Sequence, residues 1–269
     1  MRAATLLLAL GTLQGAPSLE ATLEGVFKYV VAYEARLVEF VADENMEQGR
    51  FNSASAFGVE SGATWRKWRS EVAFMRLPGG GPWLGYRNVL VVDGKPVGHD
   101  DRLQNLLARG PDEKKRAVDL AYASARFNLG LPRTTNMPTL PLEFVHPRHR
   151  DRLTYRVHGI ERVNGRQFRR LSFEERVRPT LIRDEGDVDI WSSGSIWIEE
   201  STSSIFEVEV RWPAESSLRV SFASQPGLDI LVPVRMREIF LFRSGRGSSD
   251  ARYSNFRRFA TTARIVPQP

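Results

Sequence analysis

The sequence predicts an α+β fold: a strongly curved antiparallel sheet, or half-barrel, with a long N-terminal helix and two mid-chain helices on its concave face. Three observations predict it. Strand-like segments outnumber helical ones, they follow one another as hairpins from residue 152 onward, and helical periodicity is confined to the first and middle parts of the chain. The 269-residue chain can bury a sizeable core, and it has no cysteine to form disulfides or thiolate metal sites.

The first residues resemble an export leader. Met1 and Arg2 precede an apolar run over residues 3–13, which is too short to span a bilayer, and small residues follow at Gly15 and Ala16. This pattern predicts a signal peptide over residues 1–16, a periplasmic or secreted protein, and one domain over residues 17–269. The alternative is a first helix packed in a core.

Residues 18–48 have the periodicity of one long helix. Apolar side chains recur three and four residues apart, Ser18 can cap the N-terminus, and Gly49 can end the helix. A weak strand is expected over residues 51–59 and a stronger one over residues 64–77.

The middle of the chain combines a hairpin with two helices. Residues 83–97 predict a strand, a turn at Asp93 and Gly94, and a return strand. Two shorter helices are expected over residues 100–109 and 112–129, each beginning at an aspartate and followed by a glycine. A proline-rich connector over residues 131–147 follows.

The second half reads as consecutive hairpins. Asn164 and Gly165 lie between two alternating segments, which is a strong hairpin signal. Residues 204–212 alternate between apolar side chains and the charged side chains of Glu207, Glu209 and Arg211, so this strand has one apolar and one charged face. Further strands are expected over residues 217–224, 230–243 with Pro233 at an edge or bulge, and 251–265.

No catalytic motif or cofactor fingerprint is found, so the sequence predicts neither an enzyme nor a cofactor or metal site. His146, His149 and Asp151 lie close together and are the best candidates for a metal site or an unrecognised hydrolase, with the paired glutamates as the alternative. An exposed arginine-rich turn is the simpler interpretation of the histidine segment.

The charge is basic, +6 overall with a predicted pI of about 9.9, and arginine supplies most of it. An anionic membrane surface or an envelope protein is therefore a candidate partner, whereas export disfavours nucleic acid. Arginines on the solvated faces of strands are the simpler explanation. The oligomeric state is not predicted.

One hairpin carries a family resemblance. The segment GSIWIEESTSSIFEVEV resembles a hairpin of the periplasmic lipoprotein-carrier fold, the LolA-like and LppX-like half-barrels, through Trp197, Ile198, Glu199, Thr202 and Ile205. That resemblance implies a curved sheet closed by helices over a hydrophobic cavity for acyl chains. The chain also resembles an uncharacterised family of exported bacterial proteins, in the segments YEARLVEFVADE, VDGKPV with DDRL, RPTLIR and YSNFRRF.

These observations predict a non-enzymatic protein that binds an apolar or amphiphilic ligand, such as a lipid or an acylated protein. The alternatives are an envelope interaction protein with a solid core and a basic docking face, and a hydrolase. The ligand-binding residues are expected on the inward strand faces: Trp68, Phe74, Leu90, Trp197, Phe206, Val208, Val210, Leu218, Val220 and Phe222.

Overall fold

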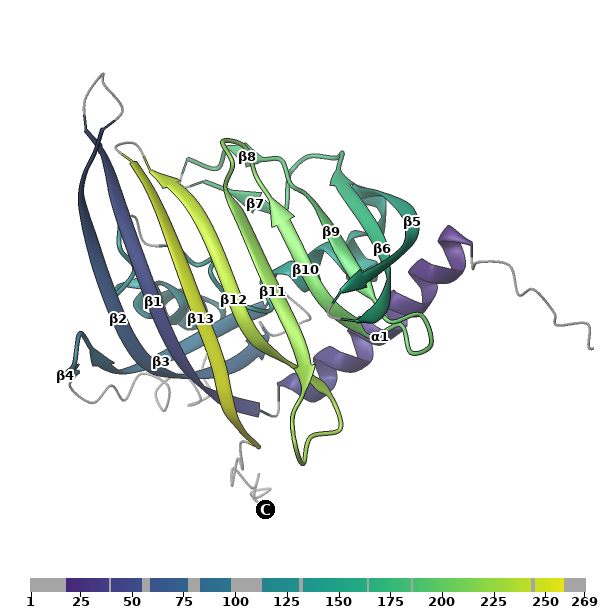
Figure 1. The fold of residues 1–269 in the computed structure, drawn as a ribbon, viewed down its shortest axis with the longest axis horizontal. Coiled ribbons are helices and arrows are strands. Elements are labelled where there is room, and N and C mark those ends of the chain that lie inside the picture. Colours follow the sequence, from purple (N-terminus) through teal and green to yellow (C-terminus); the bar gives the residue numbers. More distant parts are fainter. Residues whose placement is uncertain are drawn as a thin grey trace, which may run out of the picture.

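The strands of the protein form one open, curved, antiparallel sheet, which the computed structural model in Figure 1 shows from its broad side. The structure describes residues 18–38, 40–54, 59–76, 83–97, 113–130, 133–163, 165–184, 186–242 and 245–258. A large antiparallel sheet with few helices confirms the predicted α+β class.

Within the described ranges, eleven strands pair in the order β4-β3-β2-β1-β13-β12-β11-β10-β9-β6-β5, so the first and last long strands are neighbours inside the sheet. A separate two-stranded ribbon pairs β7 with β8. The strands are β1 (Phe40–Ala54), β2 (Val59–Arg76), β3 (Trp83–Val92), β4 (Lys95–Pro96), β5 (Leu153–Val163), β6 (Arg166–Glu175), β7 (Ile182–Arg183), β8 (Asp189–Ile190), β9 (Ser193–Ile198), β10 (Ile205–Arg211), β11 (Ser217–Ser224), β12 (Leu231–Phe242) and β13 (Gly245–Arg258).

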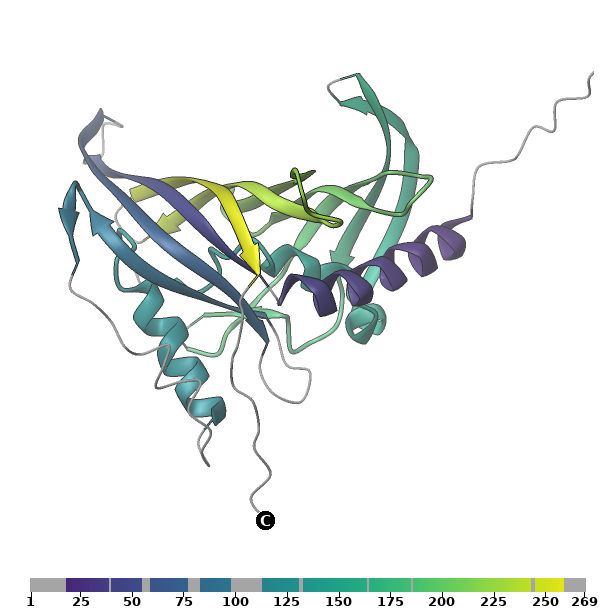
Figure 2. The ribbon, with the colours of Figure 1, turned by 90° about the horizontal axis from the view of Figure 1, so that it is seen from below.

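The helices lie on one side of this sheet, as Figure 2 shows. They are α1 (Leu19–Leu37), α3 (Glu113–Ala125) and the 3₁₀ helices η1 (Leu140–Val145) and η2 (Pro147–Arg152). None of the helices in these described ranges is long and apolar enough to span a bilayer. The helix expected over residues 100–109 and the leader expected over residues 1–16 lie outside the described residues.

The long N-terminal helix is shorter than the sequence predicts. Ser18 caps it as expected, accepting a hydrogen bond from the Ala21 amide at 3.2 Å, but α1 ends at Leu37 and β1 begins at Phe40. Residues 42–48 alternate in burial with a period of two, which is a strand pattern. The helical prediction for this part is wrong because two inward positions, Glu44 and Gln48, are polar.

The hairpin predictions hold better. Asp93 and Gly94 have φ values of 48° and 79°, which suits the tight turn between β3 and β4. Gly165 has φ 78° between β5 and β6. The register of β12 shifts beside Pro233, which confirms the bulge. The last strand begins earlier than predicted, at Gly245, because its first inward positions are glycine and serine rather than apolar residues.

A buried ion pair joins the central strands beneath α3. Glu44 on β1 and Arg87 on β3 are 2.7 Å apart, and both side chains are at most 2% exposed. Ser70 and Tyr253 donate to the same carboxylate at 2.7 and 2.9 Å, and Arg87 also donates to Asn136. Burial disfavours the charged guanidinium, but the charges and hydrogen bonds of Glu44 and Tyr253 together outweigh this effect and raise the pKa of Arg87.

Substitution of Glu44 tests how much this ion pair contributes to the free energy of unfolding. We expect Glu44→Gln to lower the free energy of unfolding by about 3–5 kcal/mol, because it leaves the Arg87 charge buried without an anion. Glu71→Gln is the matched control, since Glu71 pairs with Arg257 near the surface, and it should cost less than about 1 kcal/mol. Urea denaturation measures both variants, and equal losses would contradict the account.

Candidate functional site

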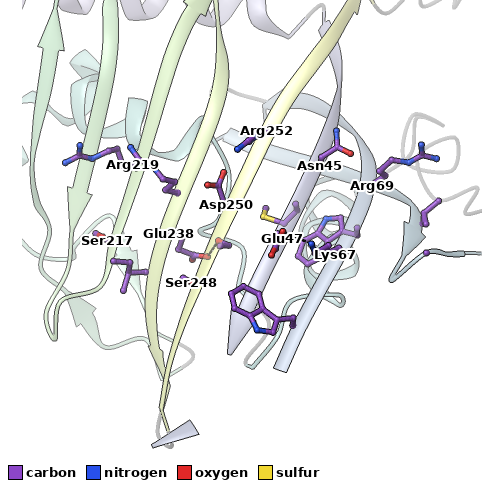
Figure 3. A pocket seen from close by; sticks show the side chains of 18 of the residues that line it. Asn45, Glu47, Lys67, Arg69, Ser217, Arg219, Glu238, Ser248, Asp250 and Arg252 are labelled. Atoms are coloured by element: carbon purple, nitrogen blue, oxygen red, sulfur yellow. Dashed lines mark hydrogen bonds and ion pairs between the residues drawn. The ribbon is translucent and has the colours of Figure 1, made fainter. Parts of the chain in front are cut away.

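The two faces of the sheet differ in chemistry, which decides where an apolar ligand can bind. The face away from the helices is charged and polar and has an open hollow of about 970 Å³, with Lys67, Arg219 and Asp250 among its lining residues (Figure 3). The face toward the helices is apolar. Of the two faces, the one toward the helices therefore has more apolar surface for an acyl chain.

Most of the predicted ligand-binding residues do lie together on that apolar face. Seven of the ten belong to one buried hydrophobic cluster: Trp68, Phe74, Val208, Val210, Leu218, Val220 and Phe222. The strand alternation that predicted their direction is therefore correct for β10 and β11. Their role in binding a ligand stays a prediction.

The other three do not join this cluster, so their predicted inward placement is wrong. Leu90 is 39% exposed, because it is the extra residue of a bulge in β3 and has no pairing partner on β2. Trp197 lies between two inward isoleucines of β9, and its indole donates to Glu161 at 2.9 Å. Phe206 lies in the bulge of β10, where it stacks on Phe168 with ring centroids 4.3 Å apart.

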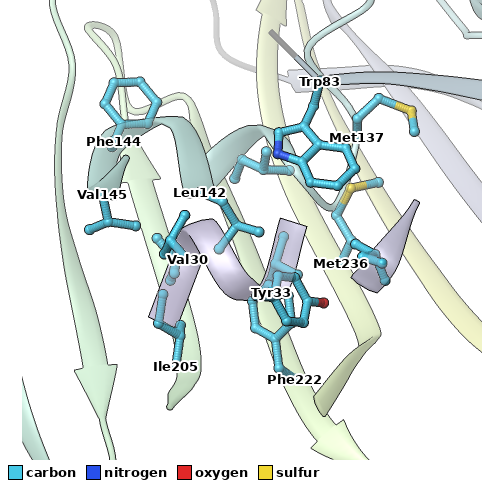
Figure 4. Packing of buried hydrophobic residues seen from close by; sticks show 14 of the residues in the cluster. Val30, Tyr33, Trp83, Met137, Leu142, Phe144, Val145, Ile205, Phe222 and Met236 are labelled. Carbon is cyan, nitrogen blue, oxygen red and sulfur yellow. The ribbon is translucent and has the colours of Figure 1, made fainter. Parts of the chain in front are cut away.

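The apolar face is covered by protein side chains. Val30 and Tyr33 of α1 and Leu142 and Phe144 of η1 are buried over the sheet, as Figure 4 shows. The rings of Tyr33 and Phe222 meet edge to face at 6.1 Å. In the described part of the chain the predicted lining residues thus form a packed core.

A groove opens beside this core at the C-terminal half of α1. It has a volume of about 400 Å³ and lies between α1 and the segment that joins β11 to β12. Its walls are mainly apolar: Tyr29, Ala32, Tyr33, Leu228, Ile230 and Leu231. This size and lining are typical of small-molecule sites. The sequence analysis missed the groove, although the spacing of Tyr29 and Tyr33 placed both rings on one helical face.

Tyr33 brings a polar atom to this apolar groove. Its side chain is 3% exposed, and its hydroxyl has no hydrogen-bond partner in the described structure. Burial raises the pKa of Tyr33 well above its usual value, so the hydroxyl stays protonated and can donate. An oxygen of a bound ligand would satisfy a donor whose isolation is otherwise unfavourable.

A cation stands at the rim of the same groove. Arg36 lines it and pairs with Asp229, whose backbone carbonyl also accepts a hydrogen bond from Arg36 at 3.2 Å. Both side chains are substantially exposed. An anionic head group at the rim would compete with Asp229 for the guanidinium. Apolar walls, one buried donor and one rim cation together suit an amphiphile.

Buried polar contacts hold α1 over the sheet next to the groove. Glu34 of α1 accepts a hydrogen bond from the Trp83 indole at 2.8 Å and lies 3.2 Å from the His146 imidazole. Glu34 and His146 are both buried. Glu34 thus anchors α1 to β3 and to the start of η2. Glu34 directly follows Tyr33 in the helix.

The histidine segment is not the exposed turn that the sequence suggested. His146 contacts Glu34, as described above. A second carboxylate, that of Glu143, lies 3.0 Å from the His149 imidazole and 2.9 Å from a guanidinium nitrogen of Arg148. Among the described residues no three His, Asp or Glu side chains are placed to hold a metal ion. The histidines contact buried carboxylates that join α1, η1 and η2.

Comparison with known proteins yields a likeness of fold. No family model and no curated protein matches the chain. Among solved structures it is similar to a putative outer membrane lipoprotein-sorting protein domain from Vibrio parahaemolyticus, with TM-score 0.45, 12% identity, and 92% of this chain and 96% of that one covered.

Two further structures are similar. One is a DUF1329 family protein from Desulfovibrio piger, with TM-score 0.39, 11% identity, and coverage of 89% and 94%. The other is LprF from Mycobacterium bovis, with TM-score 0.25, 12% identity, and coverage of 90% and 95%. At such scores and identities these structures carry no information about a ligand, which has to be inferred from the geometry of this chain.

The Glu143 cluster gives the protein a pH-dependent stability. Burial opposes ionisation of Glu143, but the hydrogen bond with His149 and the charge of Arg148 outweigh it, so its pKa lies below the usual 4.5. Its stabilising contribution is therefore complete above pH 4.5 and is lost as the pH falls through the lowered value. We expect Glu143→Gln to cost about 2 kcal/mol at pH 7 and little at pH values below the lowered pKa.

Urea denaturation across this pH range measures the difference between variant and parent. Glu174→Gln is the control, because Glu174 is exposed and pairs with Arg176 at the surface. The control should change stability by less than about 1 kcal/mol at every pH. A loss in Glu143→Gln that grows toward low pH would contradict the assignment.

Proposed function

We propose that the protein is a non-enzymatic binding protein for an amphiphile with an acyl chain, and that the groove under the C-terminal half of α1 is its entry site. The observation that carries the proposal is the Tyr33 hydroxyl, a buried donor without a partner in the described structure, at the wall of an apolar groove. Buried polar groups are normally satisfied, and a ligand oxygen in the groove would supply the partner that this hydroxyl lacks.

The chemistry of the groove suits the two halves of such a ligand. The acyl chain would lie against Tyr29, Ile230 and Leu231, and eight buried methylenes contribute about 6 kcal/mol. The polar head would accept from Tyr33 and pair with Arg36 at the rim. A lipid or the acylated end of a lipoprotein has both parts.

A longer chain needs more room than the groove offers. Tyr33 and Val30 separate the groove from Phe222 and the rest of the apolar face, so a shift of α1 would open that face to the ligand. The chain would then lie between the apolar face of the sheet and the helices. The polar contacts of Glu34 keep the closed position in the absence of ligand.

Export agrees with this function. The leader-like residues 1–16 would direct the chain to the periplasm or the outside, where lipids and acylated proteins need a carrier to cross water.

The packed core beneath α1 favours a second function, an interaction protein of the cell envelope. Such a protein needs a solid core and a docking surface, but it does not need an apolar groove. Binding of an acyl chain at the groove therefore separates the two functions.

Filling the groove tests the proposal. We expect Ala32→Trp to weaken binding of 11-dansylundecanoic acid at least tenfold, because the indole occupies the space of the chain. Ala35→Trp is the matched control: Ala35 is exposed on the same helix but does not line the groove, and this variant should bind like the parent. Fluorescence titration measures the affinities, and equal affinity of the two variants, or no binding by the parent, would contradict the proposal.

The Tyr33→Phe variant distinguishes a role of the hydroxyl in ligand binding from a role in folding. Removal of the isolated hydroxyl should leave the ligand-free protein as stable or more stable by about 1 kcal/mol, and should weaken ligand binding roughly fivefold. Thermal unfolding and the dansyl titration measure the two effects. A destabilised protein with unchanged affinity would show that the hydroxyl serves the fold and has no part in binding.

A further inference from the structure

The helix-free face of the sheet carries a hollow that is separate from the groove. Its volume is about 970 Å³, and side chains from both halves of the sheet line it, including Lys67 on β2, Arg219 on β11, Arg237 on β12 and Arg252 on β13 (Figure 3). The amphiphile groove lies on the opposite side of the sheet. Nothing in the proposed lipid function uses this hollow.

Arginines face arginines across three neighbouring strands here. Arg219 on β11 is directly opposite Arg237 on β12, and Arg235 on β12 is directly opposite Arg252 on β13. Like charges directly opposite one another destabilise a sheet. The two arginine pairs therefore lower the stability of the sheet, and an anionic ligand would offset that loss.

Internal acids neutralise only half of these arginines. Arg219 is 2.9 Å from Glu209 and 3.3 Å from Glu207, and Arg235 pairs with Asp250. Arg237 and Arg252 are exposed. Asp250 is directly opposite Arg237 in the β12–β13 register, but its carboxylate pairs with Arg235, and no ion pair within 4 Å is found for Arg237 or Arg252 in the described part of the chain. Arg237 and Arg252 thus remain for a ligand as diagonal neighbours on adjacent strands, with their backbones about 7–8 Å apart.

The rest of the lining decides what kind of anion fits. Glu47, Glu209 and Asp250 also line the hollow and would repel a dense polyanion, and a flat bilayer cannot enter a concave surface. Trp65, which is 51% exposed, and Ile239 provide an apolar wall. Carboxylates spaced along a chain with apolar side chains between them fit this mixture, and an acidic polypeptide has that composition.

We propose that the hollow docks an acidic segment of a partner protein, with carboxylates on Arg237 and Arg252 and an apolar side chain against Trp65. Guanidinium groups bind carboxylates through paired hydrogen bonds, which gives direction as well as charge. The basic charge of the chain, +6, would speed the encounter with an acidic partner.

The test uses the full chain and a fluorescein-labelled peptide of alternating glutamate and leucine, measured by fluorescence anisotropy at low salt. We expect binding that weakens as salt is added, and at least tenfold weaker binding in the double variant Arg237→Gln, Arg252→Gln. Arg156→Gln, Arg162→Gln is the matched control: it removes the same charge from exposed positions on β5, which does not line the hollow.

Thermal unfolding separates a loss of binding from a loss of folding, because these exposed arginines make no ion pair within 4 Å among the described residues and the double variant should unfold within a few degrees of the parent. Equal affinity of the double variant and the control, or no binding of the peptide, would overturn the proposal. So would binding of pyrophosphate or of phosphatidylglycerol vesicles that depends on Arg237 and Arg252 while the peptide fails to bind. A peptide of alternating lysine and leucine should not bind.

Discussion

The need to cover one apolar face of an open sheet determines the architecture of this protein. An eleven-stranded sheet that does not close leaves that face to water unless other elements lie on it, and each buried Å² of apolar surface contributes about 25 cal/mol. α1, η1 and η2 provide the cover, and α3 packs on β3. Because α1 contacts the sheet through side chains and takes no part in strand pairing, a shift of this helix would leave the strand order intact. The groove lies where this cover is incomplete.

The sequence predicted the sheet best where strands bury only apolar side chains. Val208 and Val210 face the core as the alternation indicated, and the Asp93–Gly94 turn lies where expected. Prediction failed where inward positions are polar. Glu44 points inward to an ion pair, and Gln48 donates to Asn128 at 2.9 Å, so the strand over residues 40–48 lacked the apolar pattern that identifies a strand.

The candidate site was harder to predict because it depends on register and on distant contacts. Bulges at Leu90 and Phe206 reverse the direction of a side chain, and no local signal in the sequence marks them. His146 is buried because a glutamate more than one hundred residues earlier lies beside it. The aromatic pair on α1 was visible in the sequence, but Ile230, on the other wall of the groove, could not be matched to it without the fold.

Photo-crosslinking with a diazirine-bearing fatty acid, followed by peptide mass spectrometry, tests the central claim most directly, because it reports where the chain lies. The account predicts crosslinks within residues 29–36 and 228–231, which unlabelled fatty acid competes away. Longer probes should add crosslinks at Phe222. Crosslinks confined to the hollow around Arg237 and Arg252, or none that competition removes, would contradict the assignment of the groove as an amphiphile site.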